Sequence, residues 1–541
     1  MTEKFLQYFK DMSVIKSNAQ QAFSGLAIPS FIRDWFIMRY SDSDGSVNLS
    51  LMLDKLNRYM PGKSQWNSIM DKLIEGNQVK ILARISVNID IKTGVIAFNL
   101  PDYDITSKST FIEKKVWDEV KSKILTGGEA WGVLTLSYKP ITSKESKICL
   151  EGFNAFQPYT ADLKYYKNAR KNFTLNDWLS VLLGGFDYDA NGFTEEEKLS
   201  VIRRMLIFVE NRINLIELAP KGTGKSYMFS NISKYGWLIS GGVLTRAKLF
   251  YDMNSKQEGL INRYDFVAID EISTIKIPDA DEMKGALKGY LESGKYTVGS
   301  KAGSALSGMI FLGNIDSNMF NTDLPMFSEL PAIFKDSALL DRFHGFIEGW
   351  ENPRMREEMK MKGASLNSEY FSEIMHQLRQ DITYSAIVDA MLKIDNNADT
   401  RDVTAIKKIC TAYVKLLFPH WQSVKDVDKV EFKTYCLLPA LKMRGVIRKQ
   451  LNIIDSEYKT REVLGISMVG DDEKPDLPPV NPPDFPNGDF PDNPPVDEKD
   501  ATENTDTTTK TNETVTTEVE ETETNDETCE TTEKVRVAET L

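Results

Sequence analysis

The chain has 541 residues, and its hydrophobic fraction of 41% and charged fraction of 27% are ordinary for a globular protein of about two to four domains. No apolar stretch approaches the roughly 18 residues that a membrane-spanning helix needs, and residues 1–10 lack the charged head and apolar run of a secretory signal. We therefore expect a cytoplasmic protein that makes no membrane contact.

The net charge of −13 is unevenly distributed along the chain. Residues 471–541 carry 22 acidic and 5 basic side chains, a net charge of −17, which leaves 61 basic and 57 acidic side chains, or +4, in residues 1–470. A body that is near neutral to slightly basic permits nucleic-acid binding. The tail is rich in Pro and Asp and then in Thr and Glu, so it buries too little apolar surface to fold, and we expect disorder.

The cysteines and histidines show no spacing typical of a metal or redox site. We interpret the cysteines as reduced thiols of a cytoplasmic protein, and we assign no zinc site. The residues concerned are Cys149, Cys410, Cys436, Cys529, His344, His376 and His420.

The first two regions differ in their patterns. Residues 1–75 favour helices, with an apolar patch at residues 35–38. Residues 76–160 are rich in β patterns, because residues 79–91 alternate apolar and polar side chains as a half-buried strand does. Further strands are predicted at residues 94–100, 131–138 and 147–153, and a helix at residues 110–125. Short strands with one helix suggest a small β-barrel-like domain and a DNA-binding candidate.

Residues 161–211 are predicted to form helices that precede the catalytic core. Residues 187–192 begin like a calcium-binding loop, but the twelfth position, which must supply a bidentate carboxylate, is Lys198. Thr194 and Glu197 form the pattern of a capping box. We therefore interpret this segment as a turn followed by a helix cap.

A phosphate-binding loop follows an apolar strand at residues 214–218. Its sequence, residues 219–226, is Ala-Pro-Lys-Gly-Thr-Gly-Lys-Ser, and a helix is predicted to follow. Strand, glycine loop, Lys-Ser and helix together are the context of a Walker A motif, in which backbone N–H groups converge on phosphate oxygens. We expect ATP to be bound by Gly222, Thr223, Gly224, Lys225 and Ser226. Ala219 stands where the motif has its first glycine, and a residue this small should be tolerated.

Two further apolar strands end in polar residues. Residues 266–269 lead into Asp270 and Glu271, so we expect Asp270 and Ser226 to hold Mg²⁺ and Glu271 to act as the general base. Residues 309–312 lead into Gly313 and Asn314, and Asn314 is a candidate for orienting the attacking water. The alternative for Asn314 is a turn residue after a buried strand.

Two arginines are candidates for completing a nucleotide site. Arg342, in the segment at residues 337–343, is a candidate finger that reaches the γ-phosphate of a neighbouring subunit, and the alternative is an internal ion pair with Asp341. Arg401 opens an amphipathic helix that extends to residue 417 and is expected to face the nucleotide. An arginine that acts on a neighbour implies a ring.

A β-hairpin is predicted between the two polar-ended strands, within residues 290–303. It is similar to the pore hairpin of the minichromosome-maintenance helicases, including the Lys-Ala-Gly at residues 301–303. That resemblance makes Lys301, and with it Lys295, candidates for contact with the DNA backbone, which confers affinity without sequence choice. The alternative for Lys301 is a solvated turn.

These motifs predict an α/β AAA+ P-loop motor with a helical lid, preceded by an N-terminal α+β domain. The core comprises residues 161–350 with its preceding helices, the lid residues 351–460, and the disordered acidic tail residues 471–541.

Several segments together are similar to the Lon-like ATPases of BREX phage-defence systems. They are residues 58–63, 208–226, 238–242, 266–271, 341–344 with Pro353, and 418–420, within a resemblance that covers roughly residues 50–460. The resemblance implies a ring-forming AAA+ motor, as a hexamer or double hexamer, with an N-terminal region that binds double-stranded DNA. It also implies a role in blocking phage DNA, with other phage-defence proteins as candidate partners.

The family name suggests a C-terminal Lon-type peptidase, and here the sequence departs from the pattern. Helices are predicted to end near residue 458, and the acidic tail begins about a dozen residues later, whereas a folded protease domain needs on the order of 100 residues. We therefore expect an ATPase without intrinsic protease activity.

Three functional hypotheses remain open from the sequence. The first is a ring ATPase that translocates on duplex DNA or clamps it. The second is a protein-remodelling ATPase of the unfoldase type, for which Tyr296 in the hairpin is the supporting residue. The third is a regulatory ATPase that binds only partner proteins and is not stimulated by DNA.

Overall fold

The computed structural model describes residues 2–16, 23, 28–41, 46–90, 93–124, 129–142, 145–156, 161–254 and 256–470. The predicted disordered tail at residues 471–541 lies outside these described residues.

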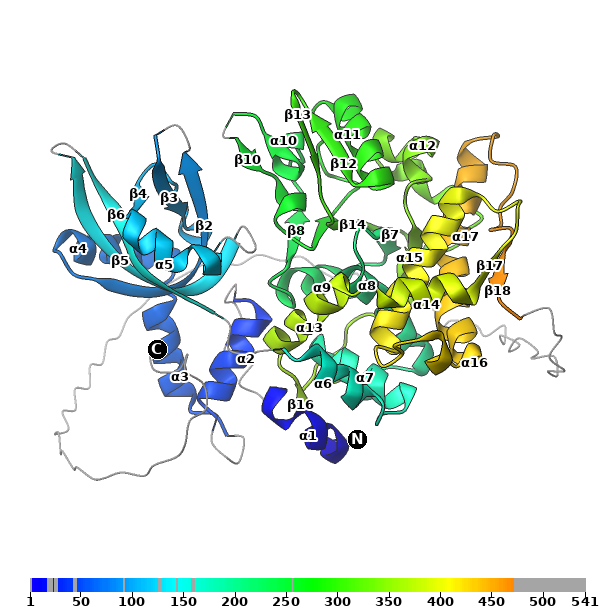
Figure 1. Cartoon of the computed structure of the whole chain (residues 1–541), viewed down its shortest axis with the longest axis horizontal. Helices are drawn as coiled ribbons and strands as arrows, with labels where there is room; N and C mark the ends of the chain where they lie inside the picture. The colour runs from blue at the N-terminus through cyan, green and yellow to red at the C-terminus, as the bar shows by residue number, and fades with distance from the viewer. Residues whose placement is uncertain are drawn as a thin grey trace, which may run out of the picture. The chain divides into compact units, whose positions relative to one another are not determined.

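The first long sheet lies within residues 79–155 (Figure 1). Its strands are β2 (Val79–Asp90), β3 (Val95–Asn99), β4 (Thr110–Ile112), β5 (Glu129–Thr142) and β6 (Glu145–Ala155), in the spatial order β3-β2-β5-β6-β4. All neighbours are antiparallel except β4 and β6. Helices α4 (Trp66–Ile74) and α5 (Lys114–Ile124) contribute Trp66 and Trp117 to the apolar core of this sheet.

The predicted strands near residues 79, 94, 131 and 147 are confirmed, but the predicted helix at residues 110–125 is wrong at its start. Thr110, Phe111 and Ile112 form β4, which pairs with residues 148–150 of β6, and the helix begins only at Lys114. β-Branched and aromatic side chains favour a strand wherever a partner strand is within reach.

The N-terminal segment is helical, as predicted, with one strand. It contains α1 (Thr2–Phe9), β1 (Ser13–Ile15), α2 (Ser30–Arg39) and α3 (Leu49–Tyr59). Strand β1 pairs with β16 (Ala364–Leu366), which lies some 350 residues later in the chain. Phe5 and Phe9 are buried in the same apolar cluster as Trp178, so the start of the chain is part of the core that also holds the catalytic sheet.

Three helices precede the catalytic sheet: α6 (Leu163–Arg170), α7 (Leu175–Gly185) and α8 (Glu195–Val209). The predicted capping box is confirmed, because Glu197 N donates to Thr194 Oγ1 at 3.2 Å and Thr194 N donates to Glu197 Oε2 at 2.8 Å. Asp187, where the calcium-like pattern begins, is buried in a left-handed backbone conformation and forms an ion pair with Lys16.

The catalytic sheet consists of five parallel strands. They are β7 (Asn214–Ala219), β8 (Gly236–Ser240), β11 (Phe266–Asp270), β14 (Gly308–Asn314) and β15 (Gly345–Glu348), in the order β15-β7-β14-β11-β8. Figure 1 labels β7, β8 and β14, with helices α8 and α9 beside them. The mixed α/β content and the parallel sheet confirm the predicted α/β fold class. Because β14 lies between β7 and β11, the carboxyl ends of these three strands meet at one edge.

Between β11 and β14 lie α11 (Ala280–Ser293) and the predicted β-hairpin. Among the described residues, its strands β12 (Lys295–Val298) and β13 (Lys301–Ser304) pair only with each other. The shorter elements around the sheet are α9 (Lys225–Asn231), α10 (Arg246–Leu249), β9 (Tyr251–Asp252), β10 (Gln257–Glu258) and α12 (Ser337–Leu340).

Residues after the sheet are mostly helical. The helices are α13 (Ser368–Gln380), α14 (Thr383–Met391), α15 (Thr400–Leu417), α16 (Lys429–Phe432) and α17 (Leu438–Ile454), and β17 (Leu392–Ile394) pairs with β18 (Ile466–Met468). Helix α15 packs against α8, and α17 packs against β15. No helix in the described part of the chain is both long and apolar enough to cross a membrane.

Candidate nucleotide site

The phosphate-binding loop leaves β7 and leads directly into α9. Gly222 and Gly224 have φ angles of 84° and 76°, in the left-handed region that glycine adopts without steric cost. Helix α9 begins at Lys225, immediately after this turn. The loop therefore has the conformation in which backbone N–H groups can approach an anion.

A cavity of about 380 Å³ lies over this loop. It is lined by residues 221–227 together with Asp270, Glu271 and Asn314. The loop supplies the five residues predicted to bind ATP. The end of β11 supplies Asp270, the predicted Mg²⁺ ligand, and Glu271, the predicted general base, and the end of β14 supplies Asn314. Residues that are as much as 92 positions apart in the chain are thus brought together at one edge of the sheet.

Lys225 and Asn314 are in direct contact at this edge. Lys225 Nζ donates to Asn314 Oδ1 at 3.1 Å and to the Pro220 carbonyl at 3.2 Å. Burial lowers the pKa of the Lys225 ammonium from its usual value. A bound polyphosphate would favour the charged form, because an opposite charge compensates for desolvation.

Ser226 and Asp270 present oxygens to the same point. Ser226 Oγ donates to Asp270 Oδ2 at 2.5 Å, and the backbone N–H of Glu271 donates to Asp270 Oδ1 at 2.8 Å. A hydroxyl beside a carboxylate is the hard-oxygen donor set that suits Mg²⁺ in phosphoryl-transfer sites. The residues present therefore fit the metal expected from the sequence.

Glu271 is exposed, and its backbone is left-handed, with φ at 57°. Its carboxylate lies against the loop after β8, where a Cβ at Gly241 would come within 2.7 Å of Glu271 Oε2. Gly241 itself has a φ of 59°. The glycine therefore leaves space for the predicted general base.

A buried ion pair that was not predicted from the sequence contacts the phosphate-binding loop. Arg204, on α8, forms a pair with Glu217, on β7, and both side chains are almost completely buried. The Arg204 guanidinium also donates to the Thr223 carbonyl at 2.6 Å and to Thr223 Oγ1 at 3.1 Å. The signal in the sequence is Glu217 itself, because a charge within an apolar strand needs a buried partner.

A second unpredicted network links the N-terminal segment to the helix of the loop. Tyr227 follows Ser226 and donates to Asp187 Oδ2 at 2.6 Å, and Arg33 of α2 donates to the Tyr227 hydroxyl at 2.9 Å. Lys16 lies fully buried between Asp187 and Asp34, 3.3 Å from an Asp34 oxygen. The two aspartates raise the pKa of Lys16 against the opposing effect of its burial.

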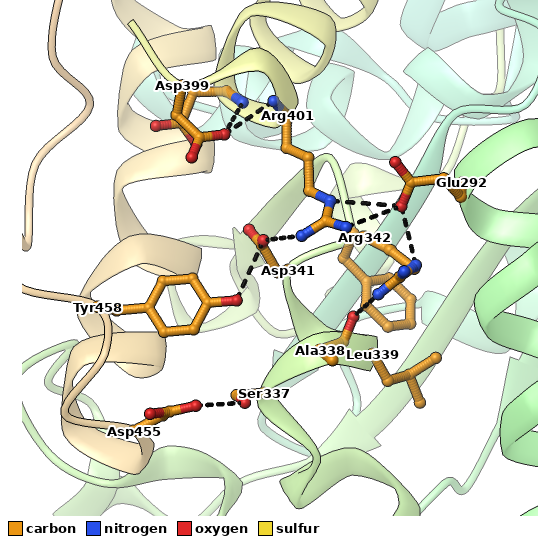
Figure 2. A network of polar contacts seen from close by, with 12 residues as sticks. Glu292, Ser337, Ala338, Leu339, Asp341, Arg342, Asp399, Arg401, Asp455 and Tyr458 are labelled. Carbon is orange, nitrogen blue, oxygen red and sulfur yellow. Dashed lines mark hydrogen bonds and ion pairs between the residues drawn. The ribbon is translucent and has the colours of Figure 1, made fainter. Parts of the chain in front are cut away.

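The two predicted arginines lie elsewhere (Figure 2). Arg342 does not form the alternative ion pair with Asp341; its Nε lies 2.9 Å from Glu292 Oε2, and its Nη1 donates to the Ala338 carbonyl. Arg401 lies 2.7 Å from Asp341 Oδ2 and 3.3 Å from Glu292 Oε2. Neither arginine is among the residues that line the loop cavity of its own chain.

The two lysines of the hairpin differ in their surroundings. Lys295 is exposed, whereas Lys301 lies 3.5 Å from Glu258 Oε1 and 4.9 Å from the centre of the Tyr251 ring, with 41% of its side chain exposed. Tyr296 is buried, and its hydroxyl accepts from Asn262 Nδ2 at 2.8 Å. The exposed polar face of the hairpin is thus basic rather than aromatic.

Comparison with known proteins places the chain in a family. Residues 148–463 match the family described as "Lon-like protease BrxL-like, ATPase domain", and residues 7–138 match "BREX system Lon protease-like protein BrxL N-terminal". Lon-like protease BrxL of Escherichia coli O9:H4 (strain HS) is 30% identical over 452 residues, which cover 82% of this chain and 64% of the relative.

Lon-like protease BrxL of Bacillus cereus (strain H3081.97) is 27% identical over 491 residues, which cover 86% of this chain and 71% of the relative. The match thus spans slightly less than two thirds of the E. coli relative and somewhat more of the B. cereus one. Because the ATPase-domain match alone covers more than half of the chain, this chain belongs to the BrxL family of Lon-like proteins of BREX systems.

Proposed function

We propose that this chain is a cytoplasmic AAA+ ATPase that assembles into a ring, binds double-stranded DNA and couples ATP hydrolysis to translocation on that DNA or to clamping it in BREX phage defence. The observation that carries the proposal is the convergence of Lys225, Ser226, Asp270, Glu271 and Asn314 on one cavity. The family match to a BrxL ATPase domain supports the same activity.

In the proposed reaction, Lys225 and the N–H groups of residues 222–226 hold the β- and γ-phosphates. Glu271 accepts a proton from the attacking water, which Asn314 orients. Ser226 and Asp270 would hold Mg²⁺, which neutralises the charge that develops on the phosphate oxygens. The cavity of one chain thus contains every proposed group except an arginine.

The proposed ring follows from the position of that arginine. Arg342 lies outside the cavity of its own chain, and 17% of its side chain is exposed. An arginine finger supplied by a second subunit stabilises the charge of the transition state in related phosphoryl-transfer enzymes. We propose that Arg342 completes the site of a neighbouring subunit, as it would in a hexameric or double-hexameric ring of the minichromosome-maintenance type.

The proposed DNA contact rests on the hairpin. Lys295 is exposed, and Lys301 begins β13, directly after the turn at residues 299–300. Two lysines on one hairpin fit a phosphate backbone, whose contacts are electrostatic and independent of sequence. The sheet at residues 79–155 is a second candidate for DNA contact, as expected for the N-terminal β region.

The word protease in the names of the relatives supports the alternative of an ATP-driven unfoldase. An unfoldase of that type grips polypeptide with exposed aromatic or apolar pore residues, and Tyr296 is the hairpin residue that would serve. Tyr296 is instead buried, 5.3 Å from the Phe250 ring centre, with its hydroxyl bonded. This burial favours the DNA proposal.

The experiment that tests the proposal is ATP turnover by the full chain with and without duplex DNA, in the wild type and in Lys301→Ala. We expect DNA to increase turnover and Lys301→Ala to reduce that increase, because a phosphate contact is lost. The matched control is Lys360→Ala, because Lys360 is also exposed and also forms an ion pair, 2.7 Å from Glu357.

Two outcomes contradict parts of the proposal. Turnover that DNA leaves unchanged would exclude DNA as the regulator of hydrolysis and would direct attention to protein substrates. Equal loss of stimulation in Lys301→Ala and Lys360→Ala would move the DNA contact away from the hairpin.

A further inference from the structure

Glu292 occupies a position that neither the motifs nor the proposed reaction explains. It lies in the last turn of α11, three residues before the hairpin begins, and 45% of its side chain is exposed. Nothing in the proposed hydrolysis uses it, and it does not line the nucleotide cavity.

One oxygen of Glu292 contacts both candidate arginines (Figure 2). Glu292 Oε2 lies 2.9 Å from Arg342 Nε and 3.3 Å from both Nε and Nη2 of Arg401. A carboxylate in contact with a guanidinium compensates the positive charge of the guanidinium, which would otherwise attract a phosphate. As long as this contact lasts, Arg342 is therefore less available to a γ-phosphate.

The two arginines differ in how firmly they are held. Arg401 is also bound to Asp341, which is itself fixed by the buried Arg444 at 2.6 Å and by the Tyr458 hydroxyl at 3.2 Å. Among the described residues, the only acidic partner of Arg342 is Glu292. Its buried Nε lies close to Glu292 but makes no well-aligned hydrogen bond, and its Nη1 donates to the carbonyl of Ala338, an uncharged partner. Arg342 is therefore the arginine that can be released.

The backbone connects Glu292 to the hairpin. Gly294, with φ at 75°, ends α11 by donating to the Tyr290 carbonyl at 2.7 Å, and its own carbonyl accepts from Ala305 N at the far end of the hairpin. The Tyr290 hydroxyl donates to the Ser307 carbonyl at 2.6 Å. A movement of the hairpin base therefore displaces the helix turn that carries Glu292.

We propose that Glu292 is a positioning residue that holds Arg342 back in the free protein and releases it when the hairpin engages DNA. This inference rests on the proposed function, because it takes Arg342 as the trans-acting finger and the hairpin as the DNA contact. It adds a route by which DNA bound at the hairpin raises ATP hydrolysis in a neighbouring subunit.

The test is ATP turnover of the full chain in Glu292→Gln, measured without and with duplex DNA. We expect turnover without DNA to rise about five-fold, the population shift that loss of one exposed ion pair produces, and stimulation by DNA to shrink correspondingly. The increase should lie in kcat, with KM for ATP unchanged, because Glu292 does not touch the cavity. Adding Arg342→Ala to Glu292→Gln should abolish the increase.

The matched control is Asp281→Asn on the same helix, where the aspartate side chain is 96% exposed and forms an ion pair with Lys284. Its turnover should equal that of the wild type. If Glu292→Gln lowers the thermal unfolding midpoint, Glu292→Asp replaces it, because the shorter carboxylate keeps the charge but cannot reach both arginines. An increase in turnover with Glu292→Asp then supports the proposal.

The possible failures can be told apart. If DNA stimulates the wild type but Glu292→Gln turns over ATP at the wild-type rate or more slowly without DNA, the positioning role is refuted and the proposed function stands. If DNA does not stimulate the wild type but Glu292→Gln is faster in an Arg342-dependent way, the DNA proposal fails and Glu292 still restrains the finger.

Discussion

The nucleotide edge of the sheet and the arginine site after α11 are organised in opposite ways. At the nucleotide edge, groups from β7, β11 and β14 already contact one another within one chain, as Lys225 and Asn314 do at 3.1 Å. At the arginine site, Arg342 and Arg401 are occupied by acidic partners and do not line the nucleotide cavity of their own chain. The nucleotide edge is therefore assembled when a single chain folds, whereas we expect the arginine site to become functional only beside a neighbouring subunit.

This difference suggests a division between binding and hydrolysis. A preassembled cavity allows ATP to bind to a single subunit, because positioning has been achieved during folding. A finger that must come from elsewhere makes the chemical step depend on assembly.

The largest effect is expected for Arg342→Ala, with a loss of turnover of about 10³-fold or more and ATP binding retained, because arginine fingers are worth that much in related enzymes. Glu271→Gln should also bind ATP without hydrolysing it. Mixing the two inactive variants should restore part of the turnover, since an intact cavity can then lie beside an intact Arg342. A mixture as inactive as its components would mean that Arg342 acts within its own chain, and the two regions would no longer differ.

The next largest effect concerns the support beneath the nucleotide edge. Arg204→Met leaves Glu217 as an unpaired buried charge, so the free energy of unfolding should fall by about 3–5 kcal/mol. Denaturant unfolding measures this loss. The double variant Arg204→Met/Glu217→Leu should recover much of it, but ATP affinity should stay reduced because Thr223 has lost its two hydrogen bonds.

Two results would contradict this account of Arg204. Wild-type stability in Arg204→Met would mean that the buried pair does not support the loop. Full ATP affinity in the double variant would show that the loop keeps its shape without Arg204.

The smallest expected effect is on the pH dependence of stability and concerns His344, which directly precedes β15. Burial holds the pKa of His344 well below its usual value, and the ring accepts a hydrogen bond from Asn214 N at 2.9 Å. Because the unfolded chain binds this proton below about pH 6.5, the free energy of unfolding should decrease as the pH falls below that value, by at most about 1.4 kcal/mol per pH unit. His344→Asn keeps an acceptor and should lose this part of the slope.

Denaturant unfolding at pH 7.5, 6.5 and 5.5 measures the slope in both proteins. Burial also lowers the pKa of His420, to about 4, so a residual slope of the same sign should persist in His344→Asn. Identical slopes in the wild type and the variant would mean that His344 takes up its proton in the folded protein.

The sequence predicted best what is encoded locally. The glycine loop, the strands that end in Asp270 and Asn314, and the hairpin each follow from fewer than about fifteen consecutive residues. The helix predicted at residues 110–125 exists, but its predicted start was wrong, because the pairing with residues 148–150 makes residues 110–112 a strand.

Long-range partners escaped prediction for the same reason. Local pattern offered Asp341 as the alternative partner of Arg342, but folding brings Glu292 to it from 50 residues away. The pairs Arg204–Glu217 and Lys16–Asp187 are likewise tertiary. Glu217 gave a usable signal as a charge in an apolar strand, whereas Lys16 gave none.

The placement of the first sixteen residues has a consequence for any attempt to isolate the motor. A fragment that begins at residue 148, where the ATPase-domain match starts, would lack Phe5 and Phe9 and would uncover the aromatic surface around Trp178. It would also lack Lys16, the buried counter-ion of the Asp187 carboxylate. That carboxylate accepts a hydrogen bond from the Tyr227 hydroxyl, next to the phosphate-binding loop. Such a fragment should aggregate or bind nucleotide poorly for reasons unrelated to DNA, so a functional fragment should include residues 2–16.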